Sequence, residues 1–433
     1  MTQISDPATT TTAGDAPTTK PGIYRGWYVA GVSAISIGAV LGSVQFAFGF
    51  FIEPLEAEFG WSRTQINVAL SIGIVSGFIS PLVGALLDRF GSRWTMAVSL
   101  ALVAAAFLLR SVMTELWQFY LFSVIIFAGT PGSTMMPASK LVMTWFPSVR
   151  GRMMGRVTAG NNLGSGAAAP IIVALIALVG WRWTYGIIGI ALLGLMMFVI
   201  VIIRDSADDV EKEKGKRWTP GEIGSQDQLS PSGGMLASEA MRTSAFWFLI
   251  VGMTLQQFVR TGVVSQLFPH LQQVGFTTIA ATIAMTLLAF GGMSSKLIFG
   301  WLSESITARL AFVLVMILQG IGMTALLVSG GSVIAWVAIL IFGLGMGGVG
   351  ALTPLVFTEM FGLKQFGRIM GLSRMAIVLP VLMGPILTGL IYDSTGSYDL
   401  MFGITIGLLV VSIGAFLLSR APGESATSSG SNS

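Results

Sequence analysis

The sequence predicts an all-α polytopic membrane protein with twelve transmembrane helices in two pseudo-symmetric six-helix halves. Three observations support this prediction. Hydrophobic residues make up 53% of the chain and charged residues only 10%, whereas charged residues form about a quarter of an ordinary soluble domain. The apolar residues fall into separate runs, each long enough to cross roughly 30 Å of hydrocarbon as a helix. Two short motifs also recur at one fixed spacing along the chain.

The apolar runs define the predicted spans in order. They lie near residues 27–51, 65–87, 94–113, 118–141, 153–178, 183–203, 245–270, 278–303, 309–329, 333–358, 368–392 and 399–419. We therefore expect an N-terminal tail (1–26), a first half (27–203), a linker (204–244), a second half (245–420) and a C-terminal tail (421–433). The tails are polar and are predicted to be disordered. The linker contains TPGEIGSQDQLSPSGG, a composition typical of a flexible connection.

The distribution of Lys and Arg between the spans predicts the orientation. With the N-terminus in the cytoplasm, 17 of these residues lie inside, and only Arg63, Arg110 and Arg182 lie outside. Cytoplasmic loops of membrane proteins carry such an excess. We therefore expect a multi-pass protein of the cell (inner or plasma) membrane with both termini cytoplasmic. The pI of about 9.5 follows from this topology and from basic residues within the spans, so no nucleic-acid partner is predicted.

The repeats indicate a duplicated unit. The stretch 84-GALLDRFGSR-93 shares its glycine, leucine, acid and arginine positions with 300-GWLSESITAR-309, which begins 216 residues later. The stretch 151-GRMMG-155 matches 367-GRIMG-371 at the same spacing. Two independent matches at one spacing are typical of a six-helix unit that has been duplicated.

The first of these motifs resembles the signature loop of the major facilitator superfamily. The resemblance rests on Gly84, Leu86, Asp88, Arg89, Gly91 and Arg93. Two further runs, 48-FGFFIEPLEAEFGWSRTQI-66 and 145-WFPSVRGRMMG-155, resemble the oxalate/formate antiporter group and the related monocarboxylate porters. The resemblance implies that Asp88, with Arg93 as a nearby partner, helps to latch the halves together in the outward-facing state. The repeated copies, Glu304 and Arg309, are expected to act in the same gate.

Four basic residues are assigned to neither side of the membrane and lie within predicted spans: Lys140, Arg260, Lys296 and Arg374. A Lys or Arg at the bilayer centre costs about 2.5–3.5 kcal/mol on insertion scales, so it normally faces the protein interior or a water-filled cavity. The spans hold no acid at similar depth, since Glu359 lies at the edge of span 333–358. Unmatched buried positive charge therefore predicts an anionic substrate. Lys140, near the end of its span, either snorkels or faces the pathway.

The resemblance makes Lys296 the leading candidate for a substrate ligand. In the resembling family a cation on the eighth span, usually arginine, binds the substrate carboxylate, and Lys296 fills that place ahead of Gly300. Oxalate-type members carry a second cation on the eleventh span, which implies a role for Arg374. Arg260 has no family counterpart, and its alternative is a charge satisfied by neighbouring carbonyl groups.

Polar residues complete the expected site. Gln256 is spaced i, i+4 from Arg260, so the two share a face of a helix. Gln45 and Asn162 carry amides that donate hydrogen bonds to a carboxylate. For all of these amide side chains, interhelical hydrogen bonding is the alternative role.

These observations predict a secondary transporter of small organic carboxylates that works by alternating access and anion exchange. In proton-linked monocarboxylate porters an aspartate lies one turn before the cation of the eighth span, and Gly292 occupies that position here. Proton-coupled monocarboxylate symport is the alternative, and an anion sensor that does not transport is a further one. We expect no enzyme activity, cofactor or metal site, because the chain has no cysteine and one histidine. The expected partners are the anion and the lipid bilayer, with a monomer sufficient for transport.

Overall fold

The computed structural model describes residues 20–205, 209, 212–213, 216–217, 233–329 and 333–419. Most of both predicted tails and the middle of the linker lie outside these residues. Ten helices in the described part are long and apolar enough to cross a membrane. Two of them, Arg63–Arg110 and Arg150–Ile202, have non-helical backbone at Gly91 and Gly180. Counting each of these two as a pair of spans gives the twelve crossings that the sequence predicts.

In the described residues, the first half consists of nine helices and helical turns, because several of its spans are interrupted. They are α1 (Gly26–Leu41), a π-helical turn η1 (Gly42–Phe46), a 3-10 turn η2 (Phe48–Phe51), α2 (Ile52–Phe59), α3 (Arg63–Ser71), α4 (Ile74–Arg110), α5 (Leu116–Ser133), α6 (Met135–Trp145) and α7 (Arg150–Ile202). The first span thus runs through α1 and η1, and the fourth through α5 and α6. A π-helical turn is rare in a helix and is often found at a functional site.

Gly91 explains how α4 holds two spans. Its backbone angles are φ 79° and ψ 174°, a conformation that residues with a Cβ adopt only with strain. A Cβ added to Gly132 of α5 would touch both Val83 and Ser99, which precede and follow Gly91. The two parts of α4 therefore lie beside the same point of α5, and the chain reverses at Gly91. Gly180, with φ 79° and ψ 167°, has the same conformation in α7.

In the second half, each span consists of a single helix, except for one span that is formed by two shorter helices. The helices are α10 (Ser244–Gln273), α11 (Thr278–Leu302), α12 (Ala308–Val328), α13 (Val333–Gly347) with α14 (Val349–Phe361), α15 (Phe366–Thr395) and α16 (Asp399–Leu418). Three of them begin at a threonine, Thr243, Thr277 or Thr307, whose hydroxyl accepts the amide of the residue three positions later. This bond satisfies an amide that has no partner within the helix.

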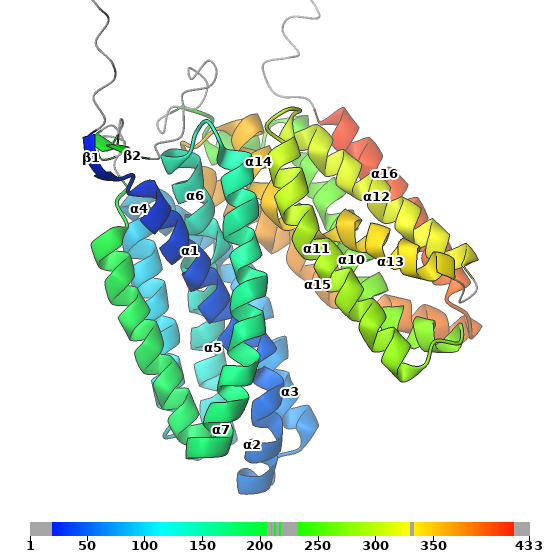
Figure 1. The fold of residues 1–433 in the computed structure, drawn as a ribbon, viewed down its shortest axis with the longest axis horizontal. Helices are drawn as coiled ribbons and strands as arrows, with labels where there is room; N and C mark the ends of the chain where they lie inside the picture. Colours follow the sequence, from blue (N-terminus) through cyan, green and yellow to red (C-terminus); the bar gives the residue numbers. More distant parts are fainter. Residues whose placement is uncertain are drawn as a thin grey trace, which may run out of the picture.

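Small elements gather at one end of the helices, which we call the linker end; the opposite end is the far end. Strand β1 (Lys20–Ile23) pairs in parallel with β2 (Lys216–Arg217) there (Figure 1). The short helix α9 (Ala237–Ala240) also belongs to the linker, and the amide of Ala237 donates to Gln365 Oε1 at 2.8 Å. The end of the linker is therefore bound to the segment that leads into α15.

The two halves meet at the linker end and diverge toward the far end (Figure 1). Helix α4 packs against α15, and α7 packs against α11 across the boundary. Three residues, Asp88, Glu304 and Lys296, form hydrogen bonds from one half to the other. These hydrogen bonds therefore add to the helix packing that joins the two halves in this conformation.

Candidate functional site

Glycines allow the backbones of the two halves to touch at the linker end. A Cβ added to Gly84 of α4 would lie 2.0 Å from the carbonyl oxygen of Gly367 in α15. A Cβ added to Gly151 of α7 would lie 2.2 Å from the carbonyl oxygen of Gly300 in α11. Both distances are far below van der Waals contact, so no larger residue fits without moving the helices apart. We call these two contacts the α4–α15 seam and the α7–α11 seam.

The seams continue one turn further into the protein. A Cβ on Gly155 would lie 2.4 Å from the carbonyl oxygen of Lys296, and one on Gly371 would lie 2.5 Å from that of Ser80. The spacing of 216 residues found in the sequence relates Gly155 to Gly371 and Ser80 to Lys296. The two seams are therefore equivalent contacts of the duplicated halves, and Lys296 lies on one of them.

A carboxylate closes each seam at the linker end. Asp88 accepts the backbone amides of Gly367 and Arg368, both at 2.9 Å, near the start of α15. Glu304 accepts the amide of Arg152 at 2.8 Å near the start of α7, and its other oxygen accepts from Arg152 Nε at 2.6 Å. Helix N-termini carry partial positive charge and unpaired amides, so carboxylates are stabilised there. We call these contacts the Asp88 latch and the Glu304 latch.

The arginines expected beside these carboxylates contact other groups. The amide of Arg93 donates to Asp205 Oδ2 at 2.9 Å, and its guanidinium lies 5.4 Å from the ring of Trp94. Lys140 Nζ, instead, lies 3.4 Å from Asp88 Oδ1. The expected pairing of Asp88 with Arg93 is therefore wrong, because the reversal at Gly91 places Arg93 on the following span.

Arg309 also differs from expectation. Its Nη1 donates to the carbonyl of Ser419 within the second half, so it does not join the two halves. The residue that does so is Arg152, which sequence reasoning missed. Its signal was present, because Arg152 and Arg368 occupy the same place in the repeated GRxMG motif.

Lys296 reaches across the α7–α11 seam with its side chain. Its Nζ donates to Asn162 Oδ1 at 2.7 Å and lies 3.4 Å from the carbonyl oxygen of Thr158, both on α7. Helical geometry places Lys296 about 9 Å from the linker end of α11. No carboxylate pairs with it among the described residues. Arg260 is close enough for its charge to repel that of Lys296, so positive charge accumulates at this point.

The other predicted cations have fewer contacts. Arg260 Nε donates to Gln257 Oε1 at 2.8 Å. Arg374 is half-buried on α15, and in the described part of the chain its side chain forms no hydrogen bond or ion pair. A Cβ added to Gly77 of α4 would lie 3.6 Å from the Arg374 carbonyl oxygen. The repeat spacing relates Arg374 to Thr158, so both belong to the boundary between the halves.

Two predicted amides take different positions. Gln256 is fully buried, and its Nε2 donates to Gln319 Oε1 of α12 at 3.2 Å. It is thus bound inside the second half, and Gln257, rather than Gln256, contacts Arg260. Gln45 lies on the π-helical turn η1 with an exposed side chain. Asn162 and Lys296 are the pair of predicted site residues that contact each other directly.

Arg110 lies inside the first half and not in an external loop, as its place in the sequence suggested. Its side chain is 5% exposed, and Nη2 donates to Ser123 Oγ at 2.7 Å. The guanidinium lies 4.5 Å from the centre of the Phe119 ring and 5.7 Å from that of Tyr185. Aromatic faces attract cations, which explains how this cation is accommodated at the far end of α4.

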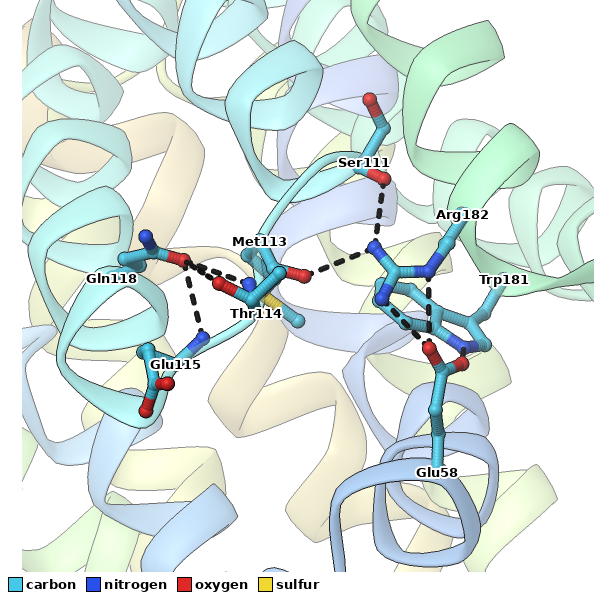
Figure 2. Close-up of polar contacts among 8 residues, drawn as sticks. All are labelled: Glu58, Ser111, Met113, Thr114, Glu115, Gln118, Trp181 and Arg182. Atoms are coloured by element: carbon cyan, nitrogen blue, oxygen red, sulfur yellow. Dashed lines mark hydrogen bonds and ion pairs between the residues drawn. The ribbon is translucent and has the colours of Figure 1, made fainter.

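A second polar cluster joins three connections of the first half at the far end (Figure 2). Arg182 Nη2 lies 2.7 Å from Glu58 Oε1, and its Nη1 donates to the carbonyls of Ser111 and Met113 at 3.2 and 2.9 Å. Trp181 Nε1 donates to Glu58 Oε2 at 2.6 Å. The hydrogen bond from Arg182 lowers the pKa of Glu58, against a smaller effect of burial. We call this cluster the far-end clasp.

Comparison with known proteins decides the family. The sequence profile of the Major Facilitator Superfamily matches residues 34–379. The chain belongs to this superfamily. Among its relatives, Monocarboxylate transporter 13 of Rattus norvegicus is 26% identical over 403 residues, which are 91% of this chain and 86% of that protein. Monocarboxylate transporter 2 of Homo sapiens is 23% identical over 419 residues, 91% of this chain and 84% of that protein.

Solved structures of the superfamily share the fold. The proton:xylose symporter XylE, bound to 6-bromo-6-deoxy-D-glucose, superposes with a TM-score of 0.67 at 12% identity, covering 92% of this chain and 96% of that one. The transporter FucP in its outward conformation gives a TM-score of 0.64 at 15% identity, with coverage of 91% and 98%. The predicted superfamily and its twelve-helix fold are thus confirmed, and the protein is a multi-pass membrane transporter.

Proposed function

We propose that this superfamily member carries small organic carboxylates across the cell membrane by alternating access, taking up one anion in exchange for another. The observation that carries the proposal is the position of Lys296. Its ammonium group lies on the boundary between the halves and is held by an amide oxygen and a backbone carbonyl. A carboxylate offers a full negative charge in place of these neutral acceptors.

Arg260 and Arg374 extend the proposed site. A second cation suits a dianion, or a monoanion with another polar group. Asn162 and Gln45 add amides that bind a carboxylate oxygen or a hydroxyl. The relatives named monocarboxylate transporters support a carboxylate as cargo.

Exchange follows from the charge of this site. The described spans pair neither Lys296 nor Arg374 with a carboxylate, so reorientation without an anion would carry unpaired positive charge through a region of low dielectric constant. Gly292, one turn before Lys296, has no titratable group that would carry a proton with the substrate. Proton symport is the second candidate, because the sequence motifs also resemble proton-linked monocarboxylate porters.

The two latches bear on the conformational state of the carrier. We assign the linker end to the cytoplasm, since most Lys and Arg residues outside the spans lie at that end. The halves are joined there and diverge toward the far end (Figure 1). This arrangement corresponds to an outward-facing carrier in which Asp88 and Glu304 keep the cytoplasmic side closed.

Counterflow in proteoliposomes tests the function. Vesicles loaded with unlabelled lactate or oxalate should accumulate the labelled anion from outside, and vesicles loaded with neutral buffer should not. Lys296→Gln should abolish accumulation because the charge is lost. Lys296→Arg should retain part of it, since arginine also pairs with carboxylates. Lys364→Gln, the same change at an exposed lysine of the linker end, serves as the matched control.

The outcomes separate the candidates. Accumulation that needs an internal anion and disappears with Lys296→Gln supports exchange. Uptake into vesicles without internal anion, driven by an imposed pH gradient, would replace exchange by proton symport. Equal flux in Lys296→Gln and in Lys364→Gln would remove Lys296 from the site.

A further inference from the structure

The contact between Lys296 and Asn162 joins the proposed substrate site to the closed seam. The backbone carbonyl of Lys296 abuts Gly155, and its side chain reaches Asn162 and Thr158. All three partners lie on α7, in the opposite half. One residue therefore supplies both the positive charge of the site and a tie across the α7–α11 seam.

This tie is weaker than the one a carboxylate would make. Asn162 Oδ1 and the carbonyl of Thr158 are neutral acceptors, and only the first lies within 3 Å of Nζ. A carboxylate carries a full negative charge, so it attracts the ammonium group more strongly than a neutral oxygen does. A carboxylate would also offset the repulsion from Arg260. An anion that reaches Lys296 therefore competes favourably with Asn162 for the same ammonium group.

We propose that Asn162 is a built-in substitute for the substrate carboxylate, which holds Lys296 against α7 until an anion displaces it and so releases the seam. This inference rests on the proposed function and adds the coupling step to it. Displacement removes the tie at Lys296 and leaves the Glu304 latch to hold this seam at the linker end. When the anion instead leaves toward the far end, the tie re-forms before the seam opens. The carrier without anion therefore stays closed at the linker end, as exchange requires.

A single introduced cysteine can report the opening of the α7–α11 seam, because the chain contains no other cysteine. Ser303 is 8% exposed, and a Cβ on Gly151 would lie 2.4 Å from its Oγ. The variant Ser303→Cys in lipid nanodiscs should react with a polar maleimide only when the seam opens. When Asn162→Leu is added to this variant, the cysteine should react several-fold faster than in Ser303→Cys alone. With Asn162→Asp it should react more slowly. A loss of packing alone would not produce these opposite effects.

Added anion completes the test. Lactate or oxalate should accelerate labelling of the reporter with Asn162 intact and should have little effect in Asn162→Leu. In proteoliposomes the half-saturating concentration for counterflow should fall in Asn162→Leu and rise in Asn162→Asp. Net efflux without external anion should increase in the leucine variant. The change Gly166→Ala, further along α7, should match the parent protein, because a Cβ there meets no atom within 4 Å.

Two results would overturn the inference. One is equal labelling of the leucine and aspartate variants. The other is labelling with Asn162 intact that neither anion accelerates, although the same protein performs counterflow. Failure of the proposed function looks different, because the effects of Asn162→Leu and Asn162→Asp on labelling in the absence of anion would persist while counterflow is absent for both anions.

Discussion

The carboxylate of Asp88 accepts the backbone amide of Arg368 at 2.9 Å, although the two residues lie 280 positions apart in the chain. The bond joins the end of the second span in the first half to the start of α15 in the second half. Its counterpart joins Glu304 to Arg152. Because each bond uses a backbone amide at a helix N-terminus, it depends on the position of a helix, and Glu304 additionally binds the side chain of Arg152.

Removing the charge of Asp88 should loosen the linker end. A carboxylate at a helix N-terminus contributes about 0.3–2 kcal/mol, and Asn keeps the shape of Asp without its charge. We expect Asp88→Asn to accelerate maleimide labelling of Ser303→Cys. Glu304→Gln should act in the same direction, because the two latches are equivalent. If Asp88→Asn left labelling unchanged while Glu304→Gln raised it, only the Glu304 latch would contribute to keeping the α7–α11 seam closed.

A side chain at Gly155 should separate the halves. The Cβ of Gly155→Ala would lie 2.4 Å from the carbonyl oxygen of Lys296, so the helices must move. We expect reporter labelling to rise about tenfold, equivalent to about 1.4 kcal/mol. Gly166→Ala on the same helix is the control, because a Cβ there meets no atom within 4 Å. Equal labelling in both variants would show that α7 and α11 are not in contact.

The two remaining cations of the proposed site should differ in their effects. Arg374→Gln removes a charge that has no partner among the described residues, and we expect a marked loss of counterflow. Arg260→Gln breaks a bond to Gln257 but also relieves repulsion of Lys296. The half-saturating concentration of Arg260→Gln for counterflow should therefore change less for a monocarboxylate than for oxalate, whose second carboxylate suits a second cation. The same loss with both anions would assign Arg260 to structure alone.

The far-end clasp predicts a pH dependence of stability. The pKa of Glu58 is lowered, chiefly by the hydrogen bond from Arg182. Its contribution is therefore complete above the ordinary glutamate pKa of about 4.3 and is lost as the pH falls through the lowered value. Since the pair is partly exposed, we expect Glu58→Gln to cost at most about 1 kcal/mol at neutral pH.

Thermal unfolding of the purified protein between pH 7 and pH 3 measures this effect. The difference in Tm between the parent protein and Glu58→Gln should shrink as the solution becomes acidic. A difference that is constant over this range would mean that the charge of Glu58 does not stabilise the clasp. Glu115→Gln is a suitable comparison, because the structure shows no ion pair for Glu115 among the described residues.

Several features of the site were predictable from the sequence, and others were not. Lys296 stands out because a lysine in an apolar span needs a compensating environment. Arg110 was misplaced because hydropathy counts a charge near the end of a span as external, whereas aromatic rings from three helices enclose it. Gln256 was misplaced because helical spacing relates it to Arg260 but does not say which neighbouring helix covers that face.

The sequence by itself determined the membrane setting, the twelve spans and the duplication, since hydrophobic length and a repeat spacing are properties of the chain alone. Only the tertiary structure decided what Asp88, Glu304 and Lys296 bind. Two of these residues bind backbone amides and the third an amide side chain of the opposite half. Every residue except proline carries a backbone amide, so the repeated motif that contains Arg152 and Arg368 does not by itself show that their amides are the partners. They are selected by the close contact that Gly84, Gly151 and Gly155 permit between the halves.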